Sequence, residues 1–225
     1  MTHSREHMAS PSVALSKWPM RPASIITDSS TIRAMPLGDS ITLGYPDNVG
    51  GWRPYVFSNH PTLWSVGTQI DGTGFSRSEK HEGFGGRNSA SALAGVATWY
   101  GAWPAGVVLL QLGTNDIGGG SPPLYTEAEF SSQMLGVINT IKGINAAVKI
   151  FLGKVPYAKL GTIPASMTNS YRAALSAAVV GVSNLVEVDF PQLPDAGFAD
   201  MVHPNAVGYA SMAATWSAAL TAAGY

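Results

Sequence analysis

The chain has 225 residues with a formal net charge of −1, and 12% of its residues are charged. This length fits one compact domain, and the mixed charges without a basic block lack the electrostatic footprint of a nucleic-acid or anionic-membrane binder, so we expect no nucleic-acid partner. The sequence contains no cysteine, which excludes disulfides, thiolate nucleophiles and thiolate metal sites.

Residues 1–30 are expected to form an N-terminal tail, followed by a single domain over residues 31–225. The first ten residues read as a vector remnant or a loose natural tail, so we assign no role to His3 and His7. They lack the basic start and apolar stretch of a signal peptide. Because a sequence can begin after a cleavage site, we favour export over a cytoplasmic location.

Five short apolar runs, each ending at Gly, Pro, Asp or Asn, predict strands at residues 32–37, 63–66, 107–112, 149–155 and 185–190. The run at 107–112 does not alternate, as expected for a central parallel strand covered on both faces. Helices are predicted at residues 52–59, 89–100, 126–145, 165–182 and 205–222. This alternation of strands and helices implies crossover connections and an α/β fold with a parallel sheet.

The segment from His203 to Tyr225 contains no Asp, Glu, Lys or Arg, which is a property of membrane spans. Asn205, Ser211 and Thr215 interrupt it, however, and argue against a span. Its larger side chains fall three or four residues apart and predict a helix with one buried face, formed by Tyr209, Met212, Trp216 and Leu220.

Four short motifs lie at or near the predicted carboxyl ends of strands, where ligands bind in parallel α/β folds. In chain order they are Gly38-Asp39-Ser40-Ile41, Gly83-Phe84-Gly85-Gly86, Gly113-Thr114-Asn115-Asp116 and Asp200-Met201-Val202-His203-Pro204. Each motif alone is typical of an ordinary turn. Together they supply a nucleophile, oxyanion donors and a base oriented by a carboxylate, and we expect them to meet at one rim of the sheet.

Ser40 follows a predicted strand at the start of a turn, where its hydroxyl and its backbone N–H can face the same space. An isolated serine there would more often be a helix cap or turn residue. His203 has Asp200 three residues before it and Pro204 directly after it. A carboxylate at one ring nitrogen leaves the other nitrogen to take a proton from serine, whereas a capping role is the alternative for an isolated histidine.

Two further motif residues are candidates for holding the charge that develops on a tetrahedral intermediate. Asn115 lies just beyond the central strand and can donate through its side-chain amide. Gly86 can bring a backbone N–H close to a substrate, and from spacing alone Gly83 or Gly85 could do so instead.

Other chemistries have less support in the sequence. The Gly-rich patterns of phosphate-binding loops do not follow the first predicted strand. His81-Glu82 begins like a zinc-protease motif, but Gly85 stands where the second histidine belongs. We therefore assign no metal.

The four motifs resemble those of the SGNH hydrolases, also called GDSL-type esterases and lipases, over residues 32–219. The residues of the family name match Ser40, Gly86, Asn115 and His203, and Ile41 replaces the Leu of the GDSL motif. The resemblance implies a flavodoxin-like, three-layer α/β/α fold with a five-stranded parallel sheet.

The resemblance also implies a role for each motif. Ser40 would attack an ester carbonyl, His203 would act as base and then as acid, and Asp200 would orient His203. The oxyanion would be held by the N–H groups of Ser40 and Gly86 and by the Asn115 amide. This acyl transfer needs no metal and no organic cofactor.

Segments 35–37, 50–53 and 81–86 resemble the acetyl-xylan esterases of carbohydrate esterase family 3. Arg87 stands where those enzymes often have Trp, and this form is similar to rhamnogalacturonan acetylesterases instead. The resemblance implies a serine esterase that removes short acyl groups, with acetyl favoured, from carbohydrate. A lysophospholipase or thioesterase of the same fold and a non-catalytic carbohydrate-binding protein are the alternatives.

Side chains near the glycine motifs are candidates for contacts with the substrate. An aromatic sugar platform could be formed by Tyr45, Trp52 and Phe84, for which core or rim packing is the alternative. Arg53 is a candidate for substrate contact, or else for an ion pair with Asp39 or Asp47. The sequence leaves the oligomeric state and the natural polysaccharide open.

Overall fold

A parallel sheet lies at the centre of the protein, seen in a computed structural model that describes residues 31–46, 50–71, 77–118 and 122–225. The predicted tail and Asp47 lie outside these ranges. Within them the sheet has seven strands: β1 (Ile32–Gly38), β2 (Leu63–Ser65), β3 (Gln69–Ile70), β4 (Lys80–Gly83), β5 (Val107–Gln111), β6 (Lys149–Gly153) and β7 (Leu185–Val188).

The strand order is β3-β4-β1-β5-β6-β7, and β2 also pairs with β1. β2 lies parallel to the first half of β1, from Ile32 to Ala34, whereas β4 lies parallel to its last two residues, Leu37 and Gly38. β2 and β4 therefore share one position in a sheet that has five parallel positions, as the family resemblance implies. The sequence did not predict β4 or the short antiparallel edge strand β3.

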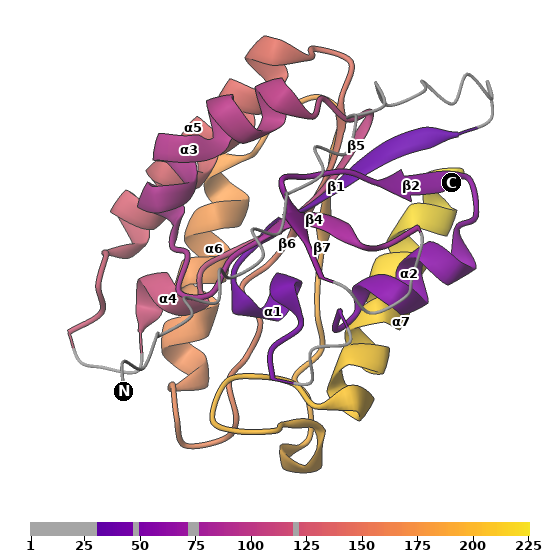
Figure 1. Cartoon of the computed structure of the whole chain (residues 1–225). Coiled ribbons are helices and arrows are strands. Elements are labelled where there is room, and N and C mark those ends of the chain that lie inside the picture. The colour runs from indigo at the N-terminus through magenta and orange to yellow at the C-terminus, as the bar shows by residue number, and fades with distance from the viewer. Residues whose placement is uncertain (1–30, 47–49, 72–76, 119–121) are drawn as a thin grey trace, which may run out of the picture.

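Helices cover both faces of the sheet and give the predicted three layers (Figure 1). One face is covered by α3 (Ser89–Ala102), α5 (Glu127–Ile144) and α6 (Ala165–Ala178), and the other by α2 (Arg53–Asn59) and α7 (Ala206–Ala222). The sequence did not predict three short elements beyond the carboxyl ends of the strands: α1 (Ser40–Leu43), α4 (Thr114–Ile117) and the 3₁₀ turn η1 (Asp195–Gly197).

The central strand β5 contributes to the cores on both faces of the sheet. Val108 and Leu110 join the cluster under α3, α5 and α6, while Val107 and Leu109 join the cluster under α2 and α7. This confirms the expectation drawn from its unbroken apolar run. The predicted stripe on α7 is buried as well, at Tyr209, Met212, Trp216 and Leu220. In the described ranges we find no helix with the length and apolar character needed to cross a membrane.

Candidate active site

Ser40 is the first residue of α1, which lies directly on the ends of two neighbouring strands. Gly38 at the end of β1 pairs in register with Gly83 at the end of β4. A Cβ atom at Gly38 would lie 2.2 Å from Thr42 Oγ1, and one at Gly83 would lie 2.5 Å from the backbone nitrogen of Leu43. Only glycine at these two positions lets α1 pack so closely on the sheet, and this packing places Ser40 at the rim.

Ser40, His203 and Asp200 form a continuous chain of hydrogen bonds. His203 Nε2 lies 2.8 Å from Ser40 Oγ, and His203 Nδ1 lies 2.8 Å from Asp200 Oδ2. Asp200 Oδ1 also accepts the backbone N–H groups of Val202 at 2.9 Å and of His203 at 2.8 Å. The carboxylate thus holds both the ring and the backbone of His203, and the second ring nitrogen is placed to remove the serine proton.

Asp200 keeps its negative charge beside the imidazole. Partial burial raises the pKa of Asp200, but hydrogen bonds from the backbone N–H groups of His203 and Val202 and from the His203 ring outweigh burial and hold this pKa below its ordinary value. The charge stabilises the imidazolium that forms when His203 takes a proton. On another side the Tyr45 ring meets His203 edge to face, with centroids 4.6 Å apart, so Tyr45 contacts the candidate base itself.

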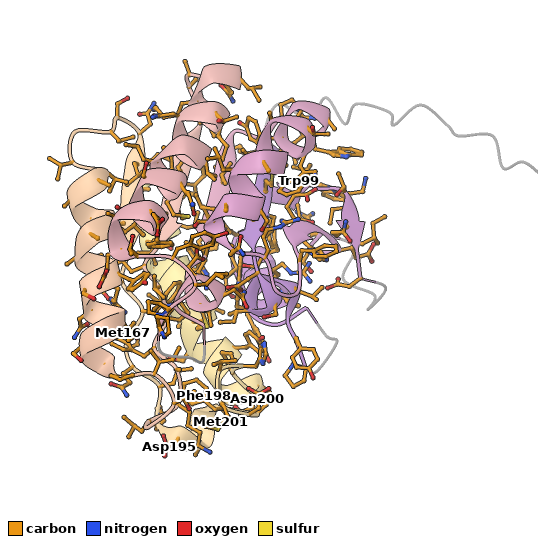
Figure 2. The ribbon with its side chains drawn as sticks, turned by 90° about the vertical axis from the view of Figure 1, so that its left-hand side faces the viewer. Trp99, Met167, Asp195, Phe198, Asp200 and Met201 are labelled. Carbon is orange, nitrogen blue, oxygen red and sulfur yellow. The ribbon has the colours of Figure 1, made fainter. Side chains whose placement is uncertain are left out.

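The loop that carries Asp200 and His203 is closed upon itself. Ala199 N donates to His203 O at 2.9 Å, and Phe198 and Pro204 form an isolated antiparallel bridge. Figure 2 shows the labelled residues of this region gathered at one end of the molecule: Asp195, Phe198, Asp200 and Met201. The closed loop limits the positions that the histidine ring can adopt relative to Ser40.

The segments that carry Gly86 and Asn115 are tied to each other and to β1. Phe84 N donates to Gly38 O at 3.1 Å, and Arg87 N donates to Phe84 O at 3.1 Å, which closes a turn containing Gly86 at a φ of 75°. Asn115 Nδ2 donates to Arg87 O at 2.9 Å, which leaves its second N–H for another acceptor. A Cβ atom at Gly86 would meet no atom within 4 Å, so the Gly86 backbone borders open space. The structure thus brings the three glycine and serine motifs to the ends of adjacent strands β4, β1 and β5.

Two buried carboxylates, Asp39 and Asp116, lie next to these segments, and their burial was not evident from the sequence. Asp39 Oδ1 caps α1 by accepting the N–H of Ile41 at 2.9 Å, while Oδ2 has no hydrogen-bond partner among the described residues. Burial raises the pKa of Asp39 to about 7, and the charge of Asp116 adds to this effect. Asp116 accepts the N–H of Ser89 at 3.0 Å and so joins α4 to the start of α3.

Asp39 is expected to make the wild-type protein less stable as pH rises, and the substitution Asp39→Asn is expected to abolish this loss of stability. Folded Asp39 holds its proton up to about pH 7, whereas in the unfolded chain the carboxyl ionises near its ordinary pKa of 3.8. Between these values the folded state binds more protons, so the free energy of unfolding falls by about 1.4 kcal/mol per pH unit, and the loss persists above pH 7. Asparagine has no such proton to lose, and its side-chain oxygen can still cap α1.

Urea unfolding of the wild type and of Asp39→Asn from about pH 4.5 to about pH 8 measures this effect. The quantity to compare is the difference in the free energy of unfolding between the two proteins at each pH. Burial also lowers the pKa of His81 to about 3, and in both proteins this makes the free energy of unfolding rise with pH, opposite to the effect of Asp39. Folding favours neutral His81, so its contribution is lost as pH falls below the ordinary pKa of 6.5. Parallel profiles for the two proteins would contradict the raised pKa of Asp39.

The structure corrects the expectation that Trp52 contacts substrate. Its side chain is 0% exposed and packs against Trp216, with ring centroids 5.4 Å apart. The ring therefore has no face free for a sugar, because the start of α2 is folded into the core beside α7. Phe84, by contrast, is 53% exposed directly after β4 and remains available to a ligand.

Arg53 does not face substrate either, because its side chain is 0% exposed. Its partner in an ion pair is Asp71 rather than Asp39, and Asp47 lies outside the described residues. The guanidinium also donates to three backbone carbonyls: Nε to Thr42 O at 2.9 Å, Nη1 to Ser78 O at 2.7 Å and Nη2 to Leu43 O at 3.1 Å. Arg53 thus holds the carboxyl end of α1, the helix that presents Ser40.

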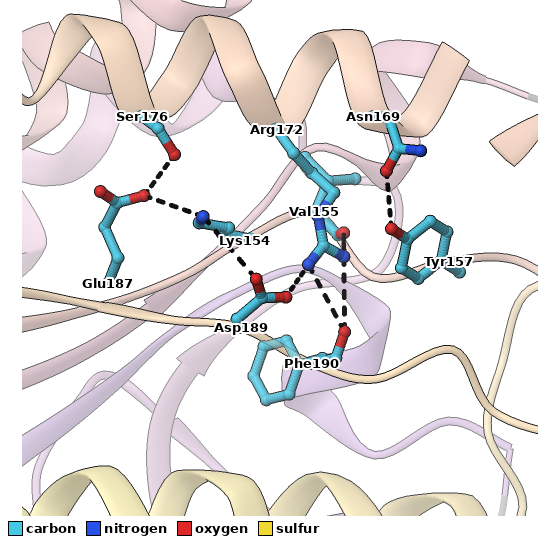
Figure 3. A network of polar contacts seen from close by, with 9 residues as sticks. All are labelled: Lys154, Val155, Tyr157, Asn169, Arg172, Ser176, Glu187, Asp189 and Phe190. Atoms are coloured by element: carbon cyan, nitrogen blue, oxygen red, sulfur yellow. Dashed lines mark hydrogen bonds and ion pairs between the residues drawn. The ribbon is translucent and has the colours of Figure 1, made fainter. Parts of the chain in front are cut away.

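A second set of polar contacts fastens the segments that follow β6 and β7 (Figure 3). Arg172 on α6 donates to Val155 O at 3.1 Å and to Phe190 O at 3.4 Å, and it pairs with Asp189. Lys154 lies 3.8 Å from the same carboxylate. This network ties α6 to the carboxyl ends of two strands.

The segment after β6 contacts the loop that carries Asp200 and His203 (the histidine loop), because Lys159 N donates to Met201 O at 3.0 Å. A cavity of about 480 Å³ opens beside the Arg172 network, but its lining includes none of the candidate catalytic and oxyanion residues Ser40, Gly86, Asn115, Asp200 and His203. Its charged groups are paired with one another, which indicates a supporting role for this region. Across the described ranges, no group of three or more His, Asp or Glu side chains is arranged to hold a metal ion.

A known protein family and solved structures match this chain over most of its length. The model of the GDSL-like lipase/acylhydrolase family matches residues 37–211. A carbohydrate esterase family 3 structure from Talaromyces cellulolyticus is 22% identical with a TM-score of 0.72, covering 86% of this chain and 98% of its own. A family 3 carbohydrate esterase from Clostridium thermocellum is 20% identical with a TM-score of 0.69, covering 86% of this chain and 96% of its own. These two structures therefore share the fold of this protein over most of its length.

A multidomain esterase from Ruminococcus flavefaciens is 26% identical over 84% of this chain. The chain spans only 28% of the length of that relative.

Proposed function

Because the chain belongs to the GDSL-like lipase/acylhydrolase family, we propose that it is a serine esterase that removes short acyl groups, acetyl above all, from carbohydrate through an acyl-enzyme on Ser40. The observation that carries this proposal is the hydrogen-bonded chain from Ser40 through His203 to Asp200, with 2.8 Å at each step. A Ser-His pair oriented by a carboxylate is suited to acyl transfer, whereas binding alone does not require it.

In the proposed first step, His203 Nε2 takes the proton of Ser40 while Oγ attacks the ester carbonyl. The negative charge on the carbonyl oxygen is held by the N–H groups of Ser40 and Gly86 and by the free N–H of the Asn115 amide. Collapse of this intermediate passes the proton from His203 to the leaving alcohol and leaves an acyl group on Ser40. Water then repeats the sequence, with His203 again as base and acid, and releases the carboxylic acid.

Two observations support a sugar ester as the substrate. The solved structures compared above are carbohydrate esterases, which favours the same substrate class. A pocket of about 410 Å³ that includes Gly86 also contains the exposed ring of Phe84, and aromatic side chains are suited to packing against sugar rings.

A long-chain substrate, such as a lysophospholipid or a long acyl thioester, is the second candidate. It is favoured by exposed apolar side chains near the histidine loop, since Leu160 is 65% and Met201 is 55% exposed. Rates on p-nitrophenyl esters from acetate to decanoate separate the two. We expect the highest kcat/KM on acetate, and a maximum at long chains would favour the second candidate.

Acetate release from acetylated xylan, pectin and chitin, with Ser40→Ala as the blank, tests the proposed function. We expect Ser40-dependent release from at least one acetylated polysaccharide and labelling of Ser40 by a fluorophosphonate probe. Saturable glycan binding without hydrolysis or labelling would identify a non-catalytic carbohydrate-binding protein instead. Turnover of simple esters without release from any glycan would leave an esterase and reject the carbohydrate substrate.

A further inference from the structure

A pocket of about 410 Å³ lies beside the candidate oxyanion glycine, and the proposed acyl transfer leaves most of it unused. Its lining includes Gly86 but neither Ser40 nor His203, so a carbonyl held by the Gly86 N–H would stand at the edge of the pocket and not inside it. An acetyl group is too small to fill such a volume. The part of the ester that extends into the pocket is therefore its alcohol.

Two aromatic rings and one cation form the wall of this pocket. The guanidinium carbon of Arg87 lies 4.0 Å from the centroid of the Trp99 ring and 5.4 Å from that of Phe84. Arg87 is only 7% exposed, donates to Glu82 O and lies 3.9 Å from the Glu82 carboxylate. The positive charge of Arg87 is thus largely balanced by Glu82 inside the protein. A ligand in the pocket would therefore meet aromatic rings that Arg87 holds in place by cation–π contacts, and not an unpaired cation.

Trp99 is held against its own helix by a glycine one turn earlier. A Cβ atom at Gly95 would lie 2.1 Å from Cζ2 of the indole, so the ring occupies the space that any larger residue at 95 would need. The ring is only partly buried and contributes to the pocket. Figure 2 shows Trp99 on the helical layer, away from the labelled residues of the histidine loop.

The position of Trp99 on α3 places it well beyond the start of this helix, which follows the Gly86 segment in the chain. Trp99 comes ten residues after Ser89, the first residue of α3, and at 1.5 Å per residue this is about 15 Å along the helix axis. Helical side chains lean back toward the amino end, which brings the indole part of the way toward Gly86. A ring bound at Trp99 would therefore neighbour the esterified sugar and not carry the ester itself.

We propose that Trp99, with Phe84 and Gln69, forms a subsite for a neutral sugar ring next to the esterified one, an inference that rests on the proposed function. The sugar packs its C–H face on the exposed ring of Phe84 and against the edge of the indole, since Arg87 and Gly95 lie against the indole faces. The Gln69 amide at the pocket edge binds the sugar hydroxyl groups. A neutral sugar is favoured over an acidic one because Arg87 is already paired with Glu82. The subsite makes the protein prefer oligosaccharide esters to single acetylated sugars.

Kinetics on two substrates tests the subsite. The ratio of kcat/KM for an acetylated xylo-oligosaccharide to kcat/KM for p-nitrophenyl acetate is expected to fall about tenfold in Trp99→Ala, as loss of one aromatic contact implies, and less in Trp99→Phe. Trp64→Ala is the matched control, since Trp64 is also partly exposed beneath an arginine, Arg77, but does not line the pocket. An unchanged ratio in Trp99→Ala, or an equal fall in Trp64→Ala, would overturn the proposal.

A binding measurement separates failure of the subsite from failure of the proposed function. Calorimetric titration of Ser40→Ala with unacetylated xylohexaose needs no turnover, and we expect saturable binding that weakens about tenfold when Trp99→Ala is added. Loss of all esterase activity in the wild type would reject the proposed function whatever this titration shows. No binding of xylohexaose, or tighter binding of an oligogalacturonate, would overturn the neutral subsite while leaving the esterase in place. Phe84→Ala, at an exposed position, repeats the test if Trp99→Ala does not fold.

Discussion

Ser40→Ala is expected to lower the hydrolysis of p-nitrophenyl acetate by about 10⁴-fold or more, which is the largest effect of any single change considered for this protein. The reason is that the acyl-enzyme forms on Ser40 Oγ, which is the hydroxyl oxygen that lies 2.8 Å from His203 Nε2. His203→Ala is expected to have a similar effect because serine is a weak nucleophile without a base.

The double variant Ser40→Ala/His203→Ala distinguishes a shared mechanism from two separate contributions. Residues that act as one unit give non-additive losses, so the double variant should be no slower than the slower single variant. Ser170→Ala, on the exposed face of α6, is the matched serine control and should keep wild-type rates. Circular dichroism and urea unfolding establish that each variant is folded. Retention of more than a tenth of the wild-type activity in folded Ser40→Ala would reject Ser40 as the nucleophile.

Arg53→Met is expected to lower the free energy of unfolding by about 3–5 kcal/mol, the range for removing one partner of a buried ion pair. The substitution leaves the carbonyls of Thr42, Leu43 and Ser78 without their donor and Asp71 without its cation. An unpaired buried acceptor costs roughly 1–3 kcal/mol, so the carbonyls account for much of the loss. Arg53→Lys should be intermediate, because an ammonium group cannot reproduce the planar set of donors.

Urea unfolding at neutral pH measures this loss, and Arg77→Met supplies the control. Arg77 is exposed and lies over the Trp64 ring, so its removal should cost about 1 kcal/mol or less. Because Arg53 holds the carboxyl end of α1, we also expect Arg53→Met to lower kcat more than Arg77→Met does. Equal stability of the two variants would show that the buried contacts of Arg53 contribute little.

The sequence predicted the elements whose apolar pattern is strong. All five predicted strands form, and the long helices begin and end within a few residues of the predicted bounds. β4 was missed because its sequence, Lys80-His81-Glu82-Gly83, contains no apolar side chain, although His81 and Glu82 are buried there. Such a strand depends on polar partners from elsewhere in the fold, which a local pattern does not reveal.

Some residues of the candidate site could likewise be predicted from the sequence, and others could not. Ser40, Asp200 and His203 could be named from their motifs, and the structure brings them into hydrogen-bond contact. The roles of Trp52 and Arg53 could not be assigned, because glycine-rich loops place a neighbouring side chain either in the core or at the rim with similar sequences. Trp99 gave no signal at all, since a tryptophan on a helix is usually a packing residue.

The link between β2 and β4 has a consequence for how this fold can vary. β2 pairs with the start of β1 and β4 with its end, and β3, which lies between them in the chain, pairs with β4. This link carries Gln69, at the wall of the pocket. It also carries Asp71 and Ser78, the partners that hold Arg53 at the carboxyl end of α1. Substrate range and the position of Ser40 are thus joined in one link: a substitution at Gln69 can alter the pocket wall alone, whereas exchange of the whole link would also loosen α1.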